Sequence, residues 1–533
     1  MISRVCKNCA QNFIIEPDDT TFYAKIGVPE PTRCPDCRYQ RRLANRNEWN
    51  FYKRNCTLCG KSMVSIYNPE YPGPVYCQPC YWSDNWDTLD YGRDFDFNRP
   101  FFEQFKEHRY NLPRIALTNK NSINSEYTNQ ASDNKNCYMC EATNNSEYCM
   151  YGNWYQSSKE CVDCWCIKEC ELLYESLDCL KCYKCAWIET AVDCNECFLG
   201  YDLRGCSNCF GCVNLRNKSY CWFNEQLTKE EYEERFRKLE WSREEIESNR
   251  EKTNALRLSL PVKHYHGGHV ISSTGDYMAH NKNAQYVFNC YENENLKFSQ
   301  DAWKAKDCMD LTETYDNALD YECEGTGWGQ RNMSVSKKWT GSDVYYSELT
   351  FNSDNLFGCI SIVKKSYCIF NKQYTPEEYK KLKQKIVAHM KKTGEWGEFF
   401  PVAISPFPYN DTVAQDYFPM TKDEVLNKGW RWYEKPKQEY RVGGDILKCA
   451  NIDCAGVGVF RLHPTEIEFY KKMHLPTPDK CFPCRLKARL ARRNPRKLWK
   501  RACMKCSKEI HSSYSPDRPE VVYCEQCYQT EIL

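Results

Sequence analysis

The spacing of cysteines constrains this chain more than any other feature of its sequence. The 533 residues include 37 Cys, and closely spaced Cys pairs occupy the first 80 and the last 85 residues. A gap of two residues lets one tight turn present two sulfurs to one ion, and structural zinc prefers four such ligands in a tetrahedron. The sequence therefore predicts four structural zinc ions, each bound by two cysteine pairs. The sixteen predicted ligands are Cys6, Cys9, Cys34, Cys37, Cys56, Cys59, Cys77, Cys80, Cys449, Cys454, Cys481, Cys484, Cys503, Cys506, Cys524 and Cys527.

The two terminal segments repeat one another. Six of the eight N-terminal ligands have a cysteine 447 positions later, and Arg38 matches Arg485 at the same offset. The first C-terminal pair, Cys449 and Cys454, departs from the pattern because it encloses four residues instead of two. Each set closes with four sulfurs, which disfavours a catalytic zinc because such a zinc keeps one position open for water or substrate.

A longer pattern surrounds the first ligands: Cys6-x2-Cys9, Phe13, Phe22-Tyr23, Gly27, Pro31 and Arg33-Cys34-Pro35-Asp36-Cys37-Arg38. This pattern resembles a bacterial "probable zinc-ribbon" domain of treble-clef type. The resemblance implies a zinc knuckle, a β-hairpin and a helix that begins at the second Cys pair, once at each end of the chain. The whole layout also resembles large uncharacterised multi-zinc-ribbon proteins of uncultivated bacteria, and that resemblance implies no particular activity.

A second set of cysteines fills the middle of the chain. Residues 121–224 hold sixteen Cys, and all except Cys166 share one phase modulo three. Helices repeat every 3.6 residues and strands every two, so a three-residue phase fits neither. We expect a β-solenoid of short rungs and tight turns, in which equivalent positions stack about 4.8 Å apart. The Asn, Asp, Ser and Gly residues between the cysteines favour such turns.

The solenoid pattern occurs twice. Asn208-Cys-Phe-Gly-Cys212 is matched 147 residues later by Asn355-Leu-Phe-Gly-Cys359, so Cys209 aligns with Leu356. A metal site would lose a ligand by this exchange, whereas a buried packing position would accept it. Interior packing is therefore the favoured interpretation of the central cysteines, and metal storage is the alternative.

Each solenoid half ends in a helix signal. Thr228-x-x-Glu231 and Thr375-Pro376-x-Glu378 are capping boxes, and apolar residues follow both at helical spacing. The predicted fold is multidomain and mainly β, with four small treble-clef or zinc-ribbon modules flanking a duplicated β-solenoid. The predicted boundaries are 1–50 for treble-clef module 1, 51–95 for zinc ribbon 2, 96–224 for solenoid half 1, 225–258 for a helix, 259–373 for solenoid half 2, 374–395 for a second helix, 396–445 for a strap rich in Pro and aromatic residues, 446–495 for treble-clef module 3, and 496–533 for zinc ribbon 4.

Composition and motifs narrow the class of protein. No run of 18 apolar residues is present and the N-terminus has no apolar leader, so we expect a cytoplasmic protein without membrane contact, whose thiols stay reduced. The P-loop, His-Glu-x-x-His and Gly-x-Ser-x-Gly motifs are absent, so we expect neither an enzyme nor a small-molecule substrate.

Three histidines, His264, His266 and His269, lie within six residues beside Gly267 and Gly268. Such a loop could bind a metal through imidazole nitrogens. No spaced carboxylate or cysteine completes a ligand set, so a solvated loop is the favoured interpretation.

Basic residues are concentrated in the two treble-clef segments, although the whole chain is balanced at 73 Lys and Arg against 72 Asp and Glu. Zinc-pinned basic helices near aromatic residues suit phosphate contacts and base stacking. The favoured function is non-catalytic recognition of nucleic acid, RNA more than DNA. Reversing Arg489, Arg492 and Arg493 should then leave folding unchanged, because exposed charges contribute little to stability. The predicted contact residues are Arg38, Arg41, Arg42, Arg46, Arg485, Lys487, Arg489, Arg492, Arg493, Arg496 and Lys497.

Two alternatives remain open for these basic segments. The protein could be a scaffold for protein assembly that is stabilised by structural zinc. The basic residues could also be neutralised within the chain, since an acidic stretch that contains Asp84, Asp87, Asp90, Asp94 and Asp96 follows the first cluster. Only phosphate binding predicts a steep loss of affinity with salt.

Overall fold

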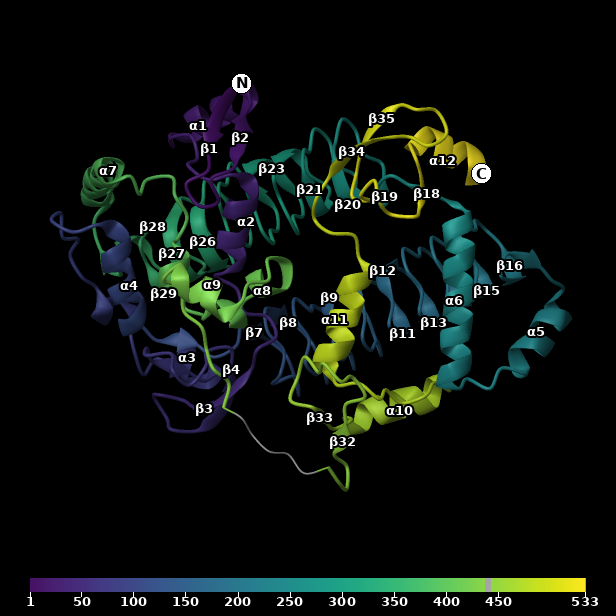
Figure 1. Ribbon diagram of the computed structural model, residues 1–533. Coiled ribbons are helices and arrows are strands. Elements are labelled where there is room, and N and C mark those ends of the chain that lie inside the picture. The colour runs from purple at the N-terminus through teal and green to yellow at the C-terminus, as the bar shows by residue number, and fades with distance from the viewer. Residues whose placement is uncertain (437–441, 533) are drawn as a thin grey trace. The chain divides into compact units, whose positions relative to one another are not determined.

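The computed structural model describes residues 1–436 and 442–532, which divide into two compact units (Figure 1). Unit 1 comprises residues 1–117 and 267–434, and unit 2 comprises residues 118–266 and 435–533. Each unit therefore joins the zinc-ligand pairs of one terminus to the central repeat that lies farther away in the sequence. No helix within the described ranges is long and apolar enough to cross a membrane.

The central part of unit 2 is a parallel ladder, called here the first ladder. Residues that pair across its parallel strands lie 12 positions apart, as in the series Cys197, Cys209 and Cys221. The final strand, β17, instead folds back antiparallel against β16. The strands of this ladder are β7 (Asn119–Lys120), β8 (Ala131–Ser132), β9 (Asn153–Gln156), β10 (Trp165–Lys168), β11 (Glu171–Tyr174), β12 (Leu177–Leu180), β13 (Tyr183–Ala186), β14 (Asn195–Phe198), β15 (Ser207–Phe210), β16 (Ser219–Trp222) and β17 (Glu225–Gln226).

The backbone of the first ladder turns every three residues. From Asp133 to Asp202 every third residue has a positive φ, near 50°, in the left-handed region. This turn explains the three-residue phase of the cysteines, because Cys137 and its phase mates directly follow these corner residues and point inward. Cys166 is the exception in phase, and it occupies a corner itself, with a φ of 52° and a half-buried side chain.

The inward thiols of the first ladder bond to the backbone. Cys137 Sγ donates to the carbonyl of Ser146 at 3.4 Å, and Cys209 Sγ donates to the carbonyl of Lys218 at 3.7 Å. Both cysteines are 1% exposed or less, so these contacts satisfy polar atoms that water cannot reach. Among the described residues, no ladder cysteine belongs to a group that could hold a metal ion. The structure therefore favours interior packing over metal storage.

Replacing Cys209 by Leu is expected to reduce the free energy of unfolding by only about 1–3 kcal/mol, the usual cost of an overpacked core position. The equivalent residue of the other repeat, Leu356, is fully buried at a parallel rung of its own ladder. Thermal denaturation and zinc analysis would check this expectation. Loss of bound zinc from the variant would contradict the packing interpretation.

The central part of unit 1 is a second parallel ladder with the same 12-residue register, as in the pair Leu356 and Cys368, except at its start, where Gly267 pairs with Met278 at an offset of 11. Its strands are β19 (Gly267–Gly268), β20 (Gly275–Ala279), β21 (Val287–Tyr291), β22 (Glu294–Lys297), β23 (Ala305–Met309), β24 (Asn317–Ala318), β25 (Gly329–Gln330), β26 (Met333–Lys338), β27 (Val344–Phe351), β28 (Asp354–Phe357), β29 (Ile360–Val363), β30 (Ser366–Ile369) and β31 (Lys372–Gln373). Aromatic and aliphatic side chains dominate the buried core around it, including Phe101, Tyr346 and Phe357.

Helices follow both ladders. The predicted helix 225–258 is two helices, α5 (Lys229–Arg237) and α6 (Arg243–Ser259), whereas α7 (Pro376–Thr393) is continuous. Thr228 and Thr375 form the predicted capping boxes with Glu231 and Glu378.

Two further segments of unit 1 cover its ladder. Residues 96–117, which the sequence analysis assigned to solenoid half 1, lie in unit 1 and contain α4 (Phe101–Asn111) and β6 (Arg114–Ile115). The described residues of the predicted strap, 396–436 and 442–445, contain two 3-10 turns, α8 (Ala414–Tyr417) and α9 (Lys422–Asn427), and the prediction for 437–441 lies outside the described residues. The strap contacts the first zinc module, where the Trp396 indole donates to the carbonyl of Gly27 at 2.9 Å.

Candidate metal centres

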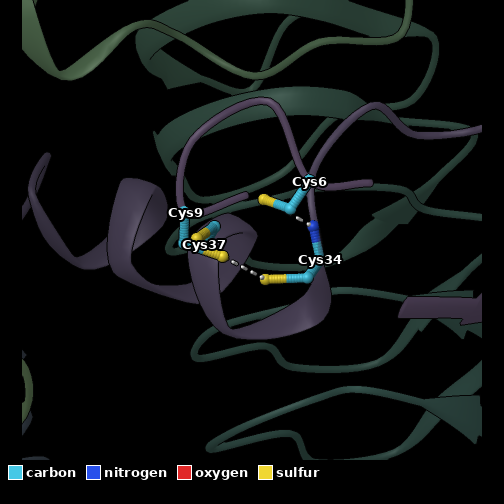
Figure 2. A group of neighbouring side chains, drawn as sticks. All are labelled: Cys6, Cys9, Cys34 and Cys37. Carbon is cyan, nitrogen blue, oxygen red and sulfur yellow. Dashed lines mark hydrogen bonds between the residues drawn. The ribbon is translucent and has the colours of Figure 1, made fainter. Parts of the chain in front are cut away.

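The first cysteine group is assembled by a hairpin and a helix. Strands β1 (Ile2–Val5) and β2 (Asn12–Ile15) flank the knuckle of Cys6 and Cys9, and α2 (Pro35–Leu43) begins directly after Cys34 (Figure 2). A helix that the sequence analysis did not anticipate, α1 (Pro17–Ile26), lies between them. The backbone amide of Cys34 donates to Cys6 Sγ at 3.3 Å. Burial opposes ionisation of Cys6, but this and other backbone hydrogen bonds lower the pKa of its thiol to about 6.

The second cysteine group has the same plan. Strands β3 (Tyr52–Asn55) and β4 (Ser62–Ser65) flank one knuckle, and β5 (Val75–Tyr76) leads into α3 (Gln78–Tyr81) at the other. The Sγ atoms of Cys59 and Cys77 lie 3.9 Å apart.

The C-terminal groups are built alike. The third uses β32 (Leu447–Lys448), β33 (Val459–Phe460), α10 (Pro464–Met473) and α11 (Phe482–Arg492), and the fourth uses β34 (Trp499–Ala502), β35 (Glu509–Ser512), β36 (Val521–Tyr523) and α12 (Glu525–Ile532). The sulfur atoms of the wider knuckle still lie close to those of the second pair. Cys454 Sγ lies 3.4 Å from Cys481 Sγ, and Cys449 Sγ lies 3.8 Å from Cys484 Sγ.

All sixteen predicted ligands fall into four groups of four. Within each group the sulfur atoms lie within 4.8 Å of one another. Zinc with Zn–S bonds of about 2.3 Å in a tetrahedron requires sulfurs about 3.8 Å apart, so the groups fit zinc. Four thiolates complete the coordination of each ion, and the zinc is therefore structural.

Elemental analysis of the intact protein is expected to give four zinc ions per chain. The reason is that the four groups in the described residues each supply four sulfurs, while the ladder cysteines supply none. Two or fewer ions in carefully prepared protein, or eight or more, would contradict this assignment.

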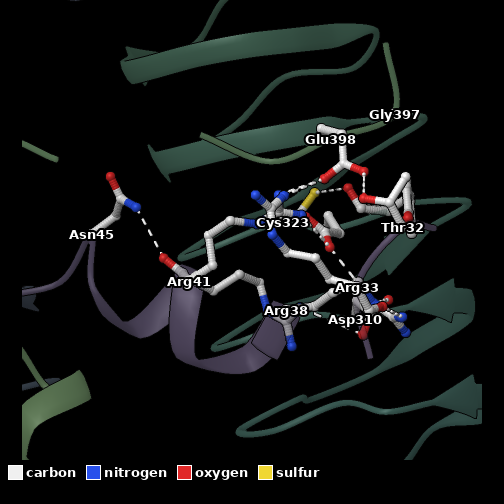
Figure 3. Close-up of polar contacts among 12 residues, drawn as sticks. Thr32, Arg33, Arg38, Arg41, Asn45, Asp310, Cys323, Gly397 and Glu398 are labelled. Atoms are coloured by element: carbon white, nitrogen blue, oxygen red, sulfur yellow. Dashed lines mark hydrogen bonds and ion pairs between the residues drawn. The ribbon is translucent and has the colours of Figure 1, made fainter. Parts of the chain in front are cut away.

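The arginines of α2 do not face solvent. Arg38, Arg41 and Arg42 of α2, and Arg46 three residues after the end of the helix, are all 4% exposed or less. Arg38 Nε donates to Asp310 of the second ladder at 2.7 Å (Figure 3). These four residues were predicted to contact nucleic acid, and their guanidinium groups instead lie inside unit 1.

Carboxylates surround the α2 arginines. Arg41 donates to Glu322 of the ladder at 2.7 Å and to Glu398 of the strap at 2.6 Å, while Arg42 donates to Thr312 and Gln300. Arg46 pairs with Glu48, Glu313 and Glu324. Although burial opposes ionisation of Glu398, Arg41 and other donors lower the pKa of its carboxyl to about 2. The first zinc module is therefore held on the second ladder by buried ion pairs.

Helix α11 repeats this arrangement in unit 2. Arg485 and Arg489, which are 6% and 2% exposed, both pair with the fully buried Asp163 of the first ladder. Arg493 donates to Asp178 at 3.0 Å, and Arg492 lies 3.4 Å from Glu189. Among the remaining predicted contact residues, Lys487 and Lys497 are exposed and Arg496 is half-buried. Six of the eleven predicted residues are thus buried, and the exposed arginine surface expected from the sequence is not formed.

The two interfaces use corresponding residues. Arg38 and Arg485 are 447 positions apart, and their partners Asp310 and Asp163 are 147 positions apart, the offsets at which the termini and the central repeats match. The same offsets relate two aromatic contacts. Tyr23 packs edge-on against Tyr321 with ring centroids 5.6 Å apart, and Tyr470 packs against Tyr174 at 5.3 Å.

These arginines are neutralised within the chain, which was one of the alternatives that the sequence left open. Their partners, however, are not the acidic residues that the sequence suggested. The acidic stretch near residue 90 pairs elsewhere, because Asp94 contacts Lys372 at 2.7 Å and Asp87 lies 3.8 Å from Lys365. Several partners of the arginines are ladder residues at corner positions, such as Asp163, with a φ of 58°, and Asp310, with a φ of 65°.

The three clustered histidines do not converge on a metal site among the described residues. His266 is 8% exposed, and its Nε2 lies 3.0 Å from the Tyr201 hydroxyl and 3.2 Å from the Tyr514 hydroxyl. His269 stacks on His280 with ring centroids 4.9 Å apart. His266 is therefore a packed core residue, and the solvated loop expected from the sequence is not formed there.

Comparisons with known proteins agree with the geometry of the first module. Residues 2–46 match the family described as "Probable treble clef domain". The first zinc module is a treble clef. No curated protein matches the chain. A solved structure, a "putative acetyltransferase" from Desulfovibrio desulfuricans G20, aligns with 50% of this chain and 68% of the acetyltransferase chain at 6% sequence identity. Its TM-score of 0.10 is too low to indicate a shared fold.

Proposed function

We propose that this protein is a non-catalytic scaffold for protein assembly, in which structural zinc modules brace two β-solenoids. The burial of the treble-clef arginines against ladder carboxylates carries this proposal, because it assigns the zinc modules a role in building the units. The 12-residue register and the three-residue turns support the interpretation of each ladder as a β-solenoid. The corresponding interfaces support an origin by internal duplication.

We also propose that the protein is not an enzyme and that it is located in the cytoplasm. Each cysteine group offers four sulfurs, which leaves no position on a bound zinc for water or substrate. The cysteines of the described residues form no disulfide, as is typical of proteins kept in a reducing compartment.

Isolation of the native protein with and without nuclease tests the scaffold proposal. We expect specific proteins to co-purify in amounts that change little with nuclease or with moderate salt. Recovery of nucleic acid as the principal partner, with loss of every protein after nuclease treatment, would contradict it.

Nucleic-acid recognition, with RNA more suitable than DNA, is the second candidate function. The arginines of α2 and α11 could reach phosphates only if the buried ion pairs opened, so this function needs another cationic surface. One observation favours it: helix α7 of unit 1 carries exposed lysines that form no ion pair within the described residues.

A further inference from the structure

We propose that the exposed face of α7 binds the phosphate backbone of nucleic acid without reading sequence. This inference goes beyond the scaffold proposal and would give the second candidate function a site. The proposed face consists of Lys380, Lys381, Lys385, Lys391 and Lys392, and is called here the lysine face.

Helical geometry gathers these lysines on one side of α7. The buried residues Tyr379, Ile386 and Met390 define the side that packs on unit 1. At about 100° per residue, the five lysines fall within an arc of roughly 140° on the opposite side. From Lys380 to Lys392 the face extends about 18 Å along the helix.

Neighbouring carboxylates offset little of the positive charge of the lysine face: the pKa of Glu378 is lowered first by hydrogen bonds from Thr375 and, to a smaller extent, by the charge of Lys381. Among the described residues none of the five ammonium groups forms an ion pair, although many other surface lysines do, such as Lys372 with Asp94. The acidic residues of α7, Glu377 and Glu378, lie in its first turn, and Glu378 is engaged in the capping box with Thr375. The rest of the helix therefore presents cations alone.

The corresponding helix of the other repeat has the opposite character. Helix α5 begins 147 positions before α7 with the same capping box, but Glu233 and Glu234 stand where α7 has Lys380 and Lys381. In α5 the charges pair, because Lys238 lies 2.7 Å from Glu234 and Lys229 lies 3.8 Å from Glu233. The lysine face is therefore a feature of unit 1 that the fold itself does not require.

The charge of the lysine face and its lack of exposed apolar residues favour nucleic acid as its partner over a membrane surface or another protein. A membrane-bound helix inserts apolar residues, and the apolar side of α7 is already buried against unit 1. A protein interface needs an apolar centre, which the lysine face lacks. Lysine side chains are mobile point charges that suit a row of phosphates, where each contact releases a counterion.

The test replaces all five lysines by Gln in the full-length, zinc-loaded protein. Binding of a fluorescent single-stranded RNA, measured by anisotropy over a range of salt, is expected to weaken roughly 100-fold at low salt. The salt slope is expected to flatten by about 0.7 for each lost contact. A matched control, K229Q/K238Q on α5, changes lysines that are already paired and is expected to bind as the unmodified protein does.

Three outcomes would overturn the proposal: no RNA binding by the unmodified protein at low salt, unchanged binding by the five-lysine variant, or equal weakening in the α5 control. In a parallel assay on vesicles that contain phosphatidylserine, equal behaviour of the variant and the unmodified protein, with RNA binding weakened roughly 100-fold, would support the site. Loss of vesicle binding alone would assign the lysine face to membranes and contradict it. Each result is independent of which proteins co-purify, so the scaffold proposal stands or fails separately.

Discussion

The Arg489→Glu variant is expected to detach the third zinc module from the first ladder and to lower the free energy of unfolding by at least about 4 kcal/mol. Arg489 is 2% exposed and pairs with Asp163, which is fully buried. The substitution would leave two carboxylates facing each other where water cannot screen them. This expectation reverses the sequence-based one, which treated Arg489, Arg492 and Arg493 as exposed.

Lys487→Glu is the matched control, because Lys487 is exposed on the same helix two residues away. A surface charge of this kind is expected to change stability by no more than about 0.5 kcal/mol. Urea denaturation, followed by circular dichroism and zinc release, would compare the two variants. Equal, small effects of both substitutions would show that Arg489 is exposed in solution.

The Cys34→Ser variant is expected to bind three zinc ions instead of four and to unfold the first treble clef. Binding of structural zinc is coupled to folding and is worth on the order of 10 kcal/mol. Cys34 also precedes α2, so its loss removes both a ligand and the anchor of the helix that carries Arg38 and Arg41. We therefore expect the ion pairs with Asp310 and Glu322 to break as well.

Zinc analysis combined with hydrogen exchange would check the Cys34→Ser variant. Faster exchange is expected throughout residues 2–46, with the C-terminal zinc groups unaffected because they lie in unit 2. Cys209→Leu provides the contrast, since it should retain all four ions. If the Cys34→Ser variant still bound four zinc ions, Cys34 would not be a zinc ligand.

The zinc groups could be predicted from the sequence because their determinants are local. A knuckle fixes two sulfurs within a few residues, and two knuckles of compatible spacing complete a site. The three-residue phase of the ladder was equally local, because each turn is set by one corner residue such as Asn136 or Asp178. Cys166 broke the phase in the sequence and occupies a corner in the structure.

The role of the arginines could not be predicted in the same way. Their partners lie hundreds of residues away, as with Arg38 and Asp310 or Arg489 and Asp163. In a sequence, a run of basic residues that contacts phosphates cannot be told from one that pairs with buried carboxylates. One signal was present in the sequence: Asp163 and Glu175 recur 147 positions later as Asp310 and Glu322.

The composition of the two units was also not evident from the sequence. The order of segments suggests that each zinc pair should pack on the neighbouring central repeat. Residues 1–117 instead form a unit with residues 267–434. The specific contacts differ between units: Arg46 meets Glu313 and Glu324, whose counterparts in the first ladder are Cys166 and Leu177. Such differences favour one pairing of module and ladder over the other.

Arginine labelling with phenylglyoxal, read out by peptide mass spectrometry, tests most directly whether the arginines of α2 and α11 belong to the fold. In the zinc-loaded protein we expect Arg38, Arg42 and Arg489 to be protected, while an exposed arginine such as Arg461 reacts. Removal of zinc with a chelator should make all three reactive, because the helices that carry them lose their anchors. Rapid labelling of Arg38, Arg42 and Arg489 in the zinc-loaded protein, at the rate of Arg461, would contradict the account.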